Sequence, residues 1–180
     1  MRKICYHVAT TLDGFIARAD GSIDGFLPGG DHVEDYQSSL AEYDTVIMGR
    51  CTYEFGYDYG LEPGARAYPH MQHYIFSRTL NVEAAEGVHI VGENWLEKID
   101  DLRNGEGADI YLCGGSVFAG WLLDQRRVDR LKLKLNPVVF GAGLKLFSTE
   151  KTNFAGFKLT NVKRYESGVM LLDYELTGNR

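Results

Sequence analysis

The sequence lacks several features that would place it in a specialised class of proteins. No apolar run approaches the roughly 18 residues of a membrane-spanning helix, and the first residues turn polar too early for a signal peptide. Lys and Arg number 19 against 25 Asp and Glu, so the net charge of −6 argues against a nucleic acid or an anionic membrane as partner. These absences predict a cytoplasmic protein that acts on a small molecule.

Motifs for metals, disulfides and common nucleotide sites are also scarce. The three cysteines, Cys5, Cys51 and Cys113, show no C-x-x-C spacing. His70 and His73 have the H-x-x-H spacing of a metal pair, but no nearby Cys, Asp or Glu completes a ligand set, so we expect no metal. The G-x-G-x-x-G fingerprint and the P-loop lysine are both missing.

The chain instead alternates short apolar runs with longer amphipathic stretches, which is typical of an α/β domain. Helices are predicted over His32–Tyr43, after a cap at Asn94, and after Gly115. Two β-rich runs around residues 166–168 predict an antiparallel hairpin, so the sheet should be parallel first and antiparallel at its end. Without a repeat or linker, residues 1–180 are predicted to form one domain. The predicted strands before that hairpin are Ile4–Thr10, 44–49, 73–77, 88–91, 108–114 and 130–140.

Adjacent glycines stand between a predicted strand and a predicted helix at Gly114 and Gly115. A helix N-terminus has unpaired N–H groups and a positive dipole end, and glycines there allow a phosphate to approach the backbone. The alternative is a plain turn, in which Ser116 caps the helix. The glycines alone leave both interpretations open.

Two further strand ends have groups that suit an anion. Gly49, Arg50 and Thr52 follow one predicted strand, and Ser77 and Arg78 follow the next. Each arginine alone could be a solvated surface charge. Because ligands of open α/β sheets bind at the carboxyl ends of strands, the recurrence of such groups favours a ligand with several phosphates.

These stretches together resemble the dihydrofolate-reductase-like fold, and within it the reductase domain at the C-terminus of the riboflavin-biosynthesis deaminase/reductase (RibD). The resemblance covers nearly the whole chain, and the order and spacing of the stretches are more specific than any one of them. They are VATTLDGFIA (8–17), VIMGRCTYE (46–54), YIFSR (74–78), IYLCGGSVFAGWLL (110–123) and LNPVVFGAGLKLF (135–147).

The resemblance implies a three-layer fold: a central eight-stranded mixed, mostly parallel sheet with helices on both faces. It also implies that NADPH binds across the strand ends and donates a hydride to a small pterin- or pyrimidine-like substrate, as in 5-amino-6-(5-phosphoribosylamino)uracil reductase. A homodimer that uses residues 130–143 and the C-terminal hairpin is a further implication. Matching of motifs places Ala9, Asp13, Gly14 and Ile16 at the nicotinamide; Gly49, Arg50 and Thr52 at the pyrophosphate and adenosine; Ser77 and Arg78 near the 2′-phosphate; and Gly114, Gly115, Ser116, Val117 and Phe118 as the pyrophosphate cradle, with a cis Gly114–Gly115 bond.

The proton donor is the least defined part of the prediction. Asp13, Asp31 and Asp35 are the candidate catalytic acids, and Glu34 lies among them. The alternative for the acids at 31–35 is that they only complement a helix dipole.

The segment 53–70 departs from the Asp-Pro-x-Leu pattern of the riboflavin reductases, which leaves the substrate open. Its tyrosines, Tyr57, Tyr59 and Tyr68, could form a stacking wall, a subunit contact or ordinary packing. A dihydrofolate reductase proper and a non-catalytic dinucleotide-binding module of the same fold are the alternative functions.

Overall fold

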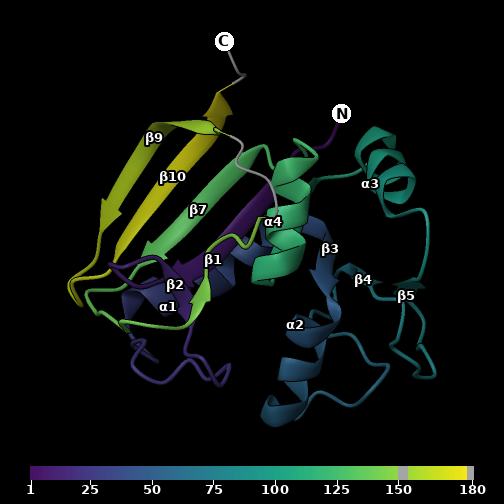
Figure 1. Cartoon of the computed structure of the whole chain (residues 1–180), viewed down its shortest axis with the longest axis horizontal. Helices are drawn as coiled ribbons and strands as arrows, with labels where there is room; N and C mark the ends of the chain where they lie inside the picture. The colour runs from purple at the N-terminus through teal and green to yellow at the C-terminus, as the bar shows by residue number, and fades with distance from the viewer. Residues whose placement is uncertain (150–153, 178–180) are drawn as a thin grey trace.

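A single eight-stranded sheet forms the centre of the computed structural model, which describes residues 1–149 and 154–177 (Figure 1). The strand order is β5-β4-β3-β6-β1-β7-β10-β9; the first six strands in this order are parallel, and β10 is antiparallel to both of its neighbours. The predicted mixed sheet and C-terminal hairpin are therefore confirmed. The strands are β1 (Ile4–Thr10), β3 (Tyr43–Gly49), β4 (Gln72–Phe76), β5 (Val88–Val91), β6 (Asp109–Gly114), β7 (Arg130–Leu135), β9 (Gly156–Arg164) and β10 (Met170–Thr177).

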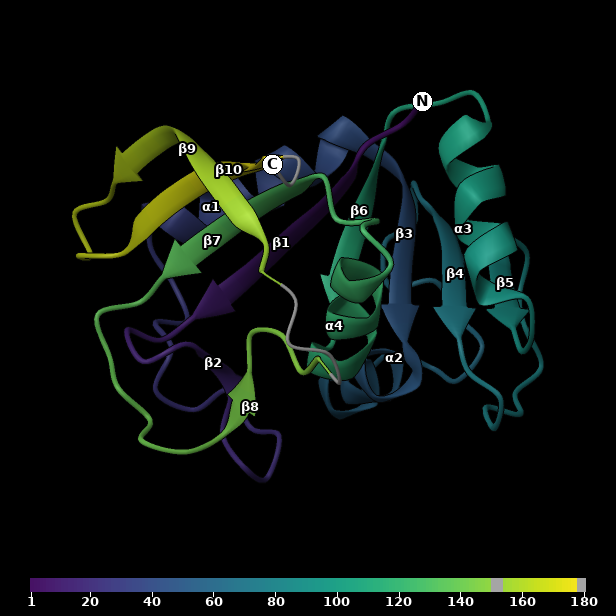
Figure 2. The same cartoon turned by 45° about the horizontal axis from the view of Figure 1, so that its top comes forward.

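Helices cover both faces of the sheet (Figure 2). On one face lie α3 (Trp95–Asn104) and α4 (Ser116–Asp124), and on the other lie α1 (Asp31–Ser39) and α2 (Arg50–Phe55). Short 3₁₀ turns, η1 (Leu40–Glu42) and η2 (Gly56–Tyr59), follow α1 and α2. Across residues 1–149 and 154–177, no helix has the length and apolarity needed to cross a membrane.

Alternating side chains along the central strands divide the core into two clusters. In β1, Ile4 and Tyr6 pack with α3 and α4, whereas Cys5 packs with the residues beneath α1 and α2. This follows from the two-residue period of a strand, which sends successive side chains to opposite faces. Each face of the sheet therefore has its own buried interior.

A small second sheet lies beyond the carboxyl end of β1 and was not predicted. Its strands, β2 (Phe15–Ala17) and β8 (Leu144–Lys145), pair in antiparallel fashion. The Cβ of a residue at position 143 would come within 2.2 Å of the Ala17 carbonyl oxygen, and the φ of Gly143 is +159°. Only glycine allows the two segments to approach this closely.

Three predicted details are wrong at the level of single residues. The helix predicted over His32–Tyr43 ends at Ser39, and Tyr43 begins β3 because its ring is buried and stacks on Tyr111 with centroids 5.5 Å apart. Strand β7 ends at Leu135 rather than at residue 140, since Pro137 cannot donate to a ladder. Asn94 precedes α3 but forms no side-chain cap; its backbone adopts φ 52°, in the left-handed region.

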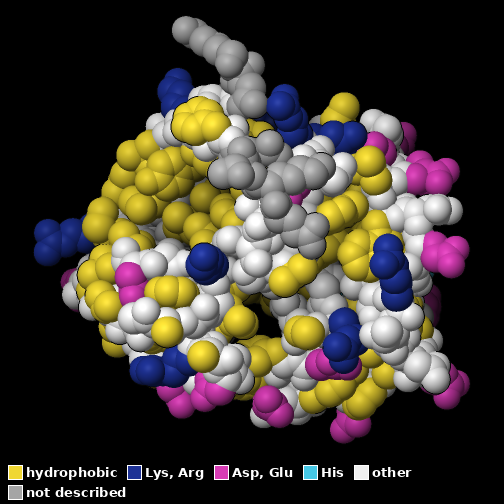
Figure 3. Space-filling view, in the orientation of Figure 1, with side chains coloured by type: hydrophobic (Ala, Val, Ile, Leu, Met, Phe, Trp, Pro, Cys, Tyr) yellow, Lys and Arg dark blue, Asp and Glu magenta, His cyan; other side chains and the backbone are white. Residues whose placement is uncertain are grey.

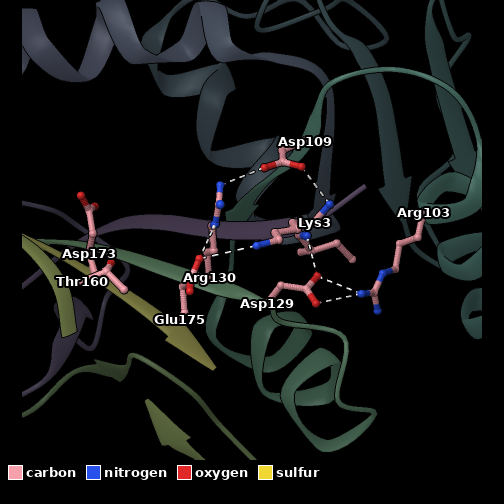
Figure 4. A network of polar contacts seen from close by, with 9 residues as sticks. Lys3, Arg103, Asp109, Asp129, Arg130, Thr160, Asp173 and Glu175 are labelled. Atoms are coloured by element: carbon pink, nitrogen blue, oxygen red, sulfur yellow. Dashed lines mark hydrogen bonds and ion pairs between the residues drawn. The ribbon is translucent and has the colours of Figure 1, made fainter. Parts of the chain in front are cut away.

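Ion pairs close the amino ends of the parallel strands (Figure 4). The carboxylate of Asp129 accepts hydrogen bonds from Arg103 Nη2 at 2.8 and 3.0 Å, and one of its oxygens also accepts the backbone N–H of Ile4 at 2.8 Å. Arg130 lies between Asp109 and Glu175, at 3.1 and 3.4 Å. Paired charges thus occupy the amino ends of the parallel strands. The carboxyl ends of these strands are the remaining place for a ligand.

Candidate cofactor site and the neighbouring α1 pocket

Two adjacent strands end in glycine at their carboxyl ends. Gly49 ends β3 and Gly114 ends β6, and the register pairs Met48 with Gly114, so the two turns are neighbours. The Gly114–Gly115 peptide bond is cis, as the resemblance implied. The residues predicted to hold the pyrophosphate therefore come together at one point.

The helix α4 begins directly after these glycines. Gly115 occupies the N-cap position without a side-chain cap, and Ala119 is the first residue whose N–H bonds back to the Gly115 carbonyl, at 2.8 Å. The N–H groups of the first turn have no partner within the helix and lie at the positive end of its dipole. The Phe118 side chain is buried in the core beside α3, so Phe118 can offer a ligand only its backbone, whereas Val117 is 73% exposed.

The Thr52 side chain faces the glycine turn from α2. A Cβ at position 115 would lie 2.9 Å from Thr52 Oγ1, and one at position 49 would lie 3.3 Å from the Phe118 Cβ. Such contacts are tighter than normal van der Waals packing, so Thr52 and Phe118 can approach these turns this closely only because the positions are glycines. The arrangement fits a group that lies directly on the backbone, as a pyrophosphate does.

The two predicted arginines have different surroundings. Arg50 forms an ion pair with Glu54 one helical turn later, at 2.9 Å. Within the described ranges Arg78 has no carboxylate partner; its guanidinium lies 5.6 Å from the Trp95 ring centroid. Arg78 lines a cavity of about 400 Å³ between the ends of β4 and β5 and the helices α3 and α4. The cavity is also lined by Glu93, Asn94, Trp95, Leu96, Glu97 and Trp121.

Ser77 directly precedes Arg78 in the chain and already has hydrogen-bond partners. Its buried Oγ accepts the N–H groups of Thr79 and Leu80, at 3.1 and 2.9 Å. Ser77 therefore shapes the turn that presents Arg78. A phosphate could still accept the Ser77 hydroxyl proton.

At the other end of the edge, the predicted nicotinamide residues form a braced turn. The Asp13 carboxylate accepts the Thr11 hydroxyl at 2.5 Å and the N–H groups of Phe140 and Gly141 at 3.2 and 2.7 Å. These donors, Thr11 first, hold the pKa of Asp13 below its ordinary value. Asp13 thus ties the 11–14 turn to the chain after β7, next to the half-buried Ala9, Gly14 and Ile16.

The acids of α1 are dispersed. Asp31 accepts the N–H groups of His32 and Glu166, at 3.0 and 3.4 Å, and Glu34 is exposed. Asp35 accepts the Tyr165 hydroxyl at 2.9 Å and pairs with Lys163, which together lower its pKa. Of the predicted acids, Asp35 alone lines a described cavity, and a catalytic role for any of them stays a prediction.

That cavity, which we call the α1 pocket, was missed by the sequence analysis. It measures about 320 Å³ and lies between α1 and strands β1, β7 and β10, with His7, Tyr36 and Lys134 among its lining residues. The run RLKLKL contained a signal: in a strand, alternating Lys132 and Lys134 share one face, and lysines on an interior strand need a reason. Their closeness to His7 depends on the pairing of β1 with β7.

The divergent segment after α2 is mostly packing. The Tyr68 ring contacts Tyr111 with centroids 5.6 Å apart, and its hydroxyl lies 3.5 Å from Cys113 Sγ. Tyr57 packs against Tyr53, whereas Tyr59 is 67% exposed.

The histidines of this segment also have protein partners. His73 lies in a strand rather than on a helix and bonds the backbone of Tyr68 and Met71; His70 bonds the Leu40 carbonyl. Among the residues whose placement is described, no group of three or more His, Cys, Asp or Glu could hold a metal ion.

Comparison with known proteins gives consistent matches over the whole chain. The family model of the RibD C-terminal domain matches residues 2–171. The uncharacterized protein YwjB of Bacillus subtilis is 31% identical, over 94% of this chain and 96% of its own. A putative riboflavin biosynthesis protein from Shewanella has a TM-score of 0.79 at 22% identity, covering 99% of this chain and 100% of its own. The dihydrofolate reductase of Enterococcus faecalis, solved with NADP(H), has a TM-score of 0.60 at 17% identity over 97% and 94% of the two chains. The dihydrofolate-reductase-like fold is thereby confirmed.

Proposed function

Because the chain belongs to the RibD C-terminal domain family, we propose that it is an NADPH-dependent reductase of a small heterocyclic substrate. The observation that carries the proposal is the glycine cradle, where a Cβ at position 115 would lie 2.9 Å from Thr52 Oγ1. The solved dihydrofolate reductase with NADP(H) and the riboflavin biosynthesis protein of the same fold support it. The substrate class is pterin- or pyrimidine-like, of the riboflavin-pathway type.

Bound NADPH would supply the hydride, and the protein would supply binding and orientation. The N–H groups at the start of α4 would hold the pyrophosphate beside Thr52. Arg78, which has no carboxylate partner in the described chain, would pair with the 2′-phosphate in its cavity. Arg50 would lie closer to the pyrophosphate and would exchange Glu54 for it.

A titration with NADPH and NADH, followed by the fluorescence of Trp95 and Trp121, tests this proposal because both indoles line the Arg78 cavity. We expect Arg78→Ala to weaken NADPH binding about ten- to hundredfold and to leave NADH binding nearly unchanged, since one charge-assisted hydrogen bond is lost. Arg50→Ala should weaken the binding of NADPH and of NADH equally, and by less than Arg78→Ala weakens the binding of NADPH. If neither dinucleotide binds, the reductase proposal is wrong. The protein would then have the fold without binding its usual cofactor.

We also propose that two copies pair through the sheet face formed by β7, β9 and β10. Hydrophobic side chains gather over these strands, beside α4 (Figure 3). Leu159 and Val162 are 46% and 47% exposed there, and the register places Val162 beside Leu172, which in turn lies beside Leu133. A contiguous apolar strand face of this kind is typical of an interface between subunits.

Sedimentation of the full chain tests this pairing. We expect a species of twice 20.2 kDa, and Val162→Glu should convert it to the monomer without unfolding it, because Val162 is half exposed. Ile23→Glu is a control at an exposed aliphatic residue outside residues 130–143 and the C-terminal hairpin, 37% exposed. A wild-type chain that sediments as a monomer would overturn the proposal.

A further inference from the structure

Most of the charged side chains that line the α1 pocket have a partner of opposite charge. Lys132 pairs with Glu42 at 3.1 Å, and Asp35 pairs with Lys163 and the Tyr165 hydroxyl. Lys134 forms no ion pair within the described part of the chain; its ammonium lies 3.5 Å from the centroid of the Tyr36 ring. The charged and titratable groups that line or border the pocket are His7, His32, Asp35, Tyr36, Glu42, Cys113, Lys132, Lys134, Lys163, Tyr165 and Asp173. Of the lysines that line the pocket, Lys134 thus has no ion-pair partner within the described ranges.

The surroundings of Lys134 disfavour that charge. Burial lowers the pKa of Lys134 to about 8, so its ammonium form is desolvated without a carboxylate to compensate. The contact with the Tyr36 ring compensates only in part. An anion in the pocket would restore the balance that the chain itself does not provide.

His7 adds an unused hydrogen-bonding group to the same cavity. It is 2% exposed, and neither ring nitrogen has a partner among the described residues. Burial, followed by the charges of Lys134 and Lys132, lowers its pKa to about 3, so the ring stays neutral and can donate one N–H. A buried polar group without a partner costs free energy, which a ligand that accepts this N–H would recover.

The pocket lies beside the proposed site of hydride transfer. In the pairing of β1 with β7, Lys134 is the register partner of Ala9, which is predicted to line the nicotinamide, and His7 lies two residues before Ala9. The ring of His7 also meets that of Tyr36 edge-on, with centroids 5.0 Å apart. Aromatic surfaces and a cation thus occur together next to the predicted position of the nicotinamide.

We propose that the α1 pocket binds the carboxylate of a flat, ring-containing acid, with the Lys134 ammonium as counter-ion, His7 as hydrogen-bond donor and the Tyr36 ring as an apolar wall. A carboxylate has one negative charge, which matches the single unpaired cation. A phosphate dianion would bring a second charge for which the described pocket has no free cation. The inference rests on the proposed function only in identifying this acid, a pterin- or pyrimidine-like ring that bears a carboxylate, as the reductase substrate.

Calorimetric titration of the full chain with benzoate tests the pocket directly, with benzamide as the uncharged analogue and inorganic phosphate as the competing anion. We expect benzoate to bind at least tenfold more tightly than either analogue at pH 7. Lys134→Met should weaken benzoate binding about ten- to hundredfold, whereas Lys134→Arg should retain most of it. Lys158→Met, at an exposed lysine of β9, removes the same charge elsewhere and should change nothing.

The pH dependence gives a second readout that needs no variant. Because Lys134 must be protonated to bind benzoate, the affinity should fall by about tenfold per pH unit above the Lys134 pKa of about 8. Benzoate binding equal to that of benzamide, or unchanged in Lys134→Met, would overturn the proposal, as would preferred binding of phosphate. An NADPH titration of the same sample separates the two proposals: benzoate binding without NADPH binding would refute the reductase and retain the pocket.

Discussion

The two faces of the sheet are built from different chemistry. Beneath α3 and α4, the buried cluster consists of aliphatic and aromatic side chains, such as Ile47, Leu112 and Phe118. Beneath α1 and α2, the interior also contains His7 and the hydroxyl of Tyr111, and Lys134 borders it. One face gains stability by excluding water, whereas the other keeps groups that water or a ligand would satisfy better.

This difference indicates a division of labour between stability and binding. A neutral histidine without partners and a desolvated ammonium both cost free energy, and apolar residues of similar volume would avoid that cost. They lie on the face that adjoins the predicted nicotinamide end, not on the face that holds α4 in place. Substitutions on the two faces should therefore change the free energy of unfolding with different pH dependence.

The largest effect should come from the apolar face. Leu112 is fully buried at the centre of the sheet, so Leu112→Ala removes packed methyl groups and leaves a cavity. We expect a loss of about 3 kcal/mol in the free energy of unfolding, measured by urea denaturation. The loss should be the same at pH 5 and pH 7, because the removed groups do not titrate; a loss that varies with pH would contradict the assignment of this face.

A pH-dependent effect of about 2 kcal/mol should come from His7 on the other face. Its pKa falls from 6.5 to about 3 on folding, so the unfolded chain binds a proton that the folded chain does not between these values. Stability is therefore lost as the pH falls below 6.5, by up to about 1.4 kcal/mol per unit. His73, with a pKa lowered to about 4, adds a contribution of the same sign.

The variant His7→Leu should remove one of these two contributions. Relative to wild type, it should gain about 2 kcal/mol between pH 6.5 and pH 5, measured from urea unfolding at each pH. Leu112→Ala is the matched control, because it should shift the whole curve without changing its slope. An unchanged slope in His7→Leu would show that the His7 ring is solvated or protonated in the folded protein.

The sequence was sufficient to predict the apolar framework and the glycine cradle, because both depend on local patterns. Alternating runs identified the strands, and Gly114–Gly115 before an amphipathic stretch indicated the glycine turn that begins α4. The predicted end of α1 was wrong because Tyr43, which has a helical spacing from Leu40, belongs to β3, where its ring stacks on Tyr111.

The α1 pocket, in contrast, could not be read from local patterns. It depends on which strands become neighbours. His7 and Lys134 are far apart along the chain, and they face the same cavity only because β7 pairs with β1 after the crossover through α4. The spacing of the lysines in RLKLKL shows that both lie on one face of the strand, but it does not show which strand pairs with it. Long-range pairing, and not local propensity, determines this site.

The smallest effect should distinguish the two ends of one hydrogen bond on the polar face. The hydroxyls of Tyr36 and Tyr111 lie 2.8 Å apart, but Tyr36 lines the α1 pocket whereas Tyr111 is 1% exposed. Tyr111→Phe should cost about 1 kcal/mol, because water entering the pocket can replace the lost partner of Tyr36. Tyr36→Phe should cost more, since the buried Tyr111 hydroxyl then keeps as partners only the His7 carbonyl, at 3.5 Å, and the Cys113 thiol, a weak acceptor. Equal losses in urea unfolding would mean that both hydroxyls are equally closed to solvent, and the α1 pocket would then be too dry to admit a charged ligand.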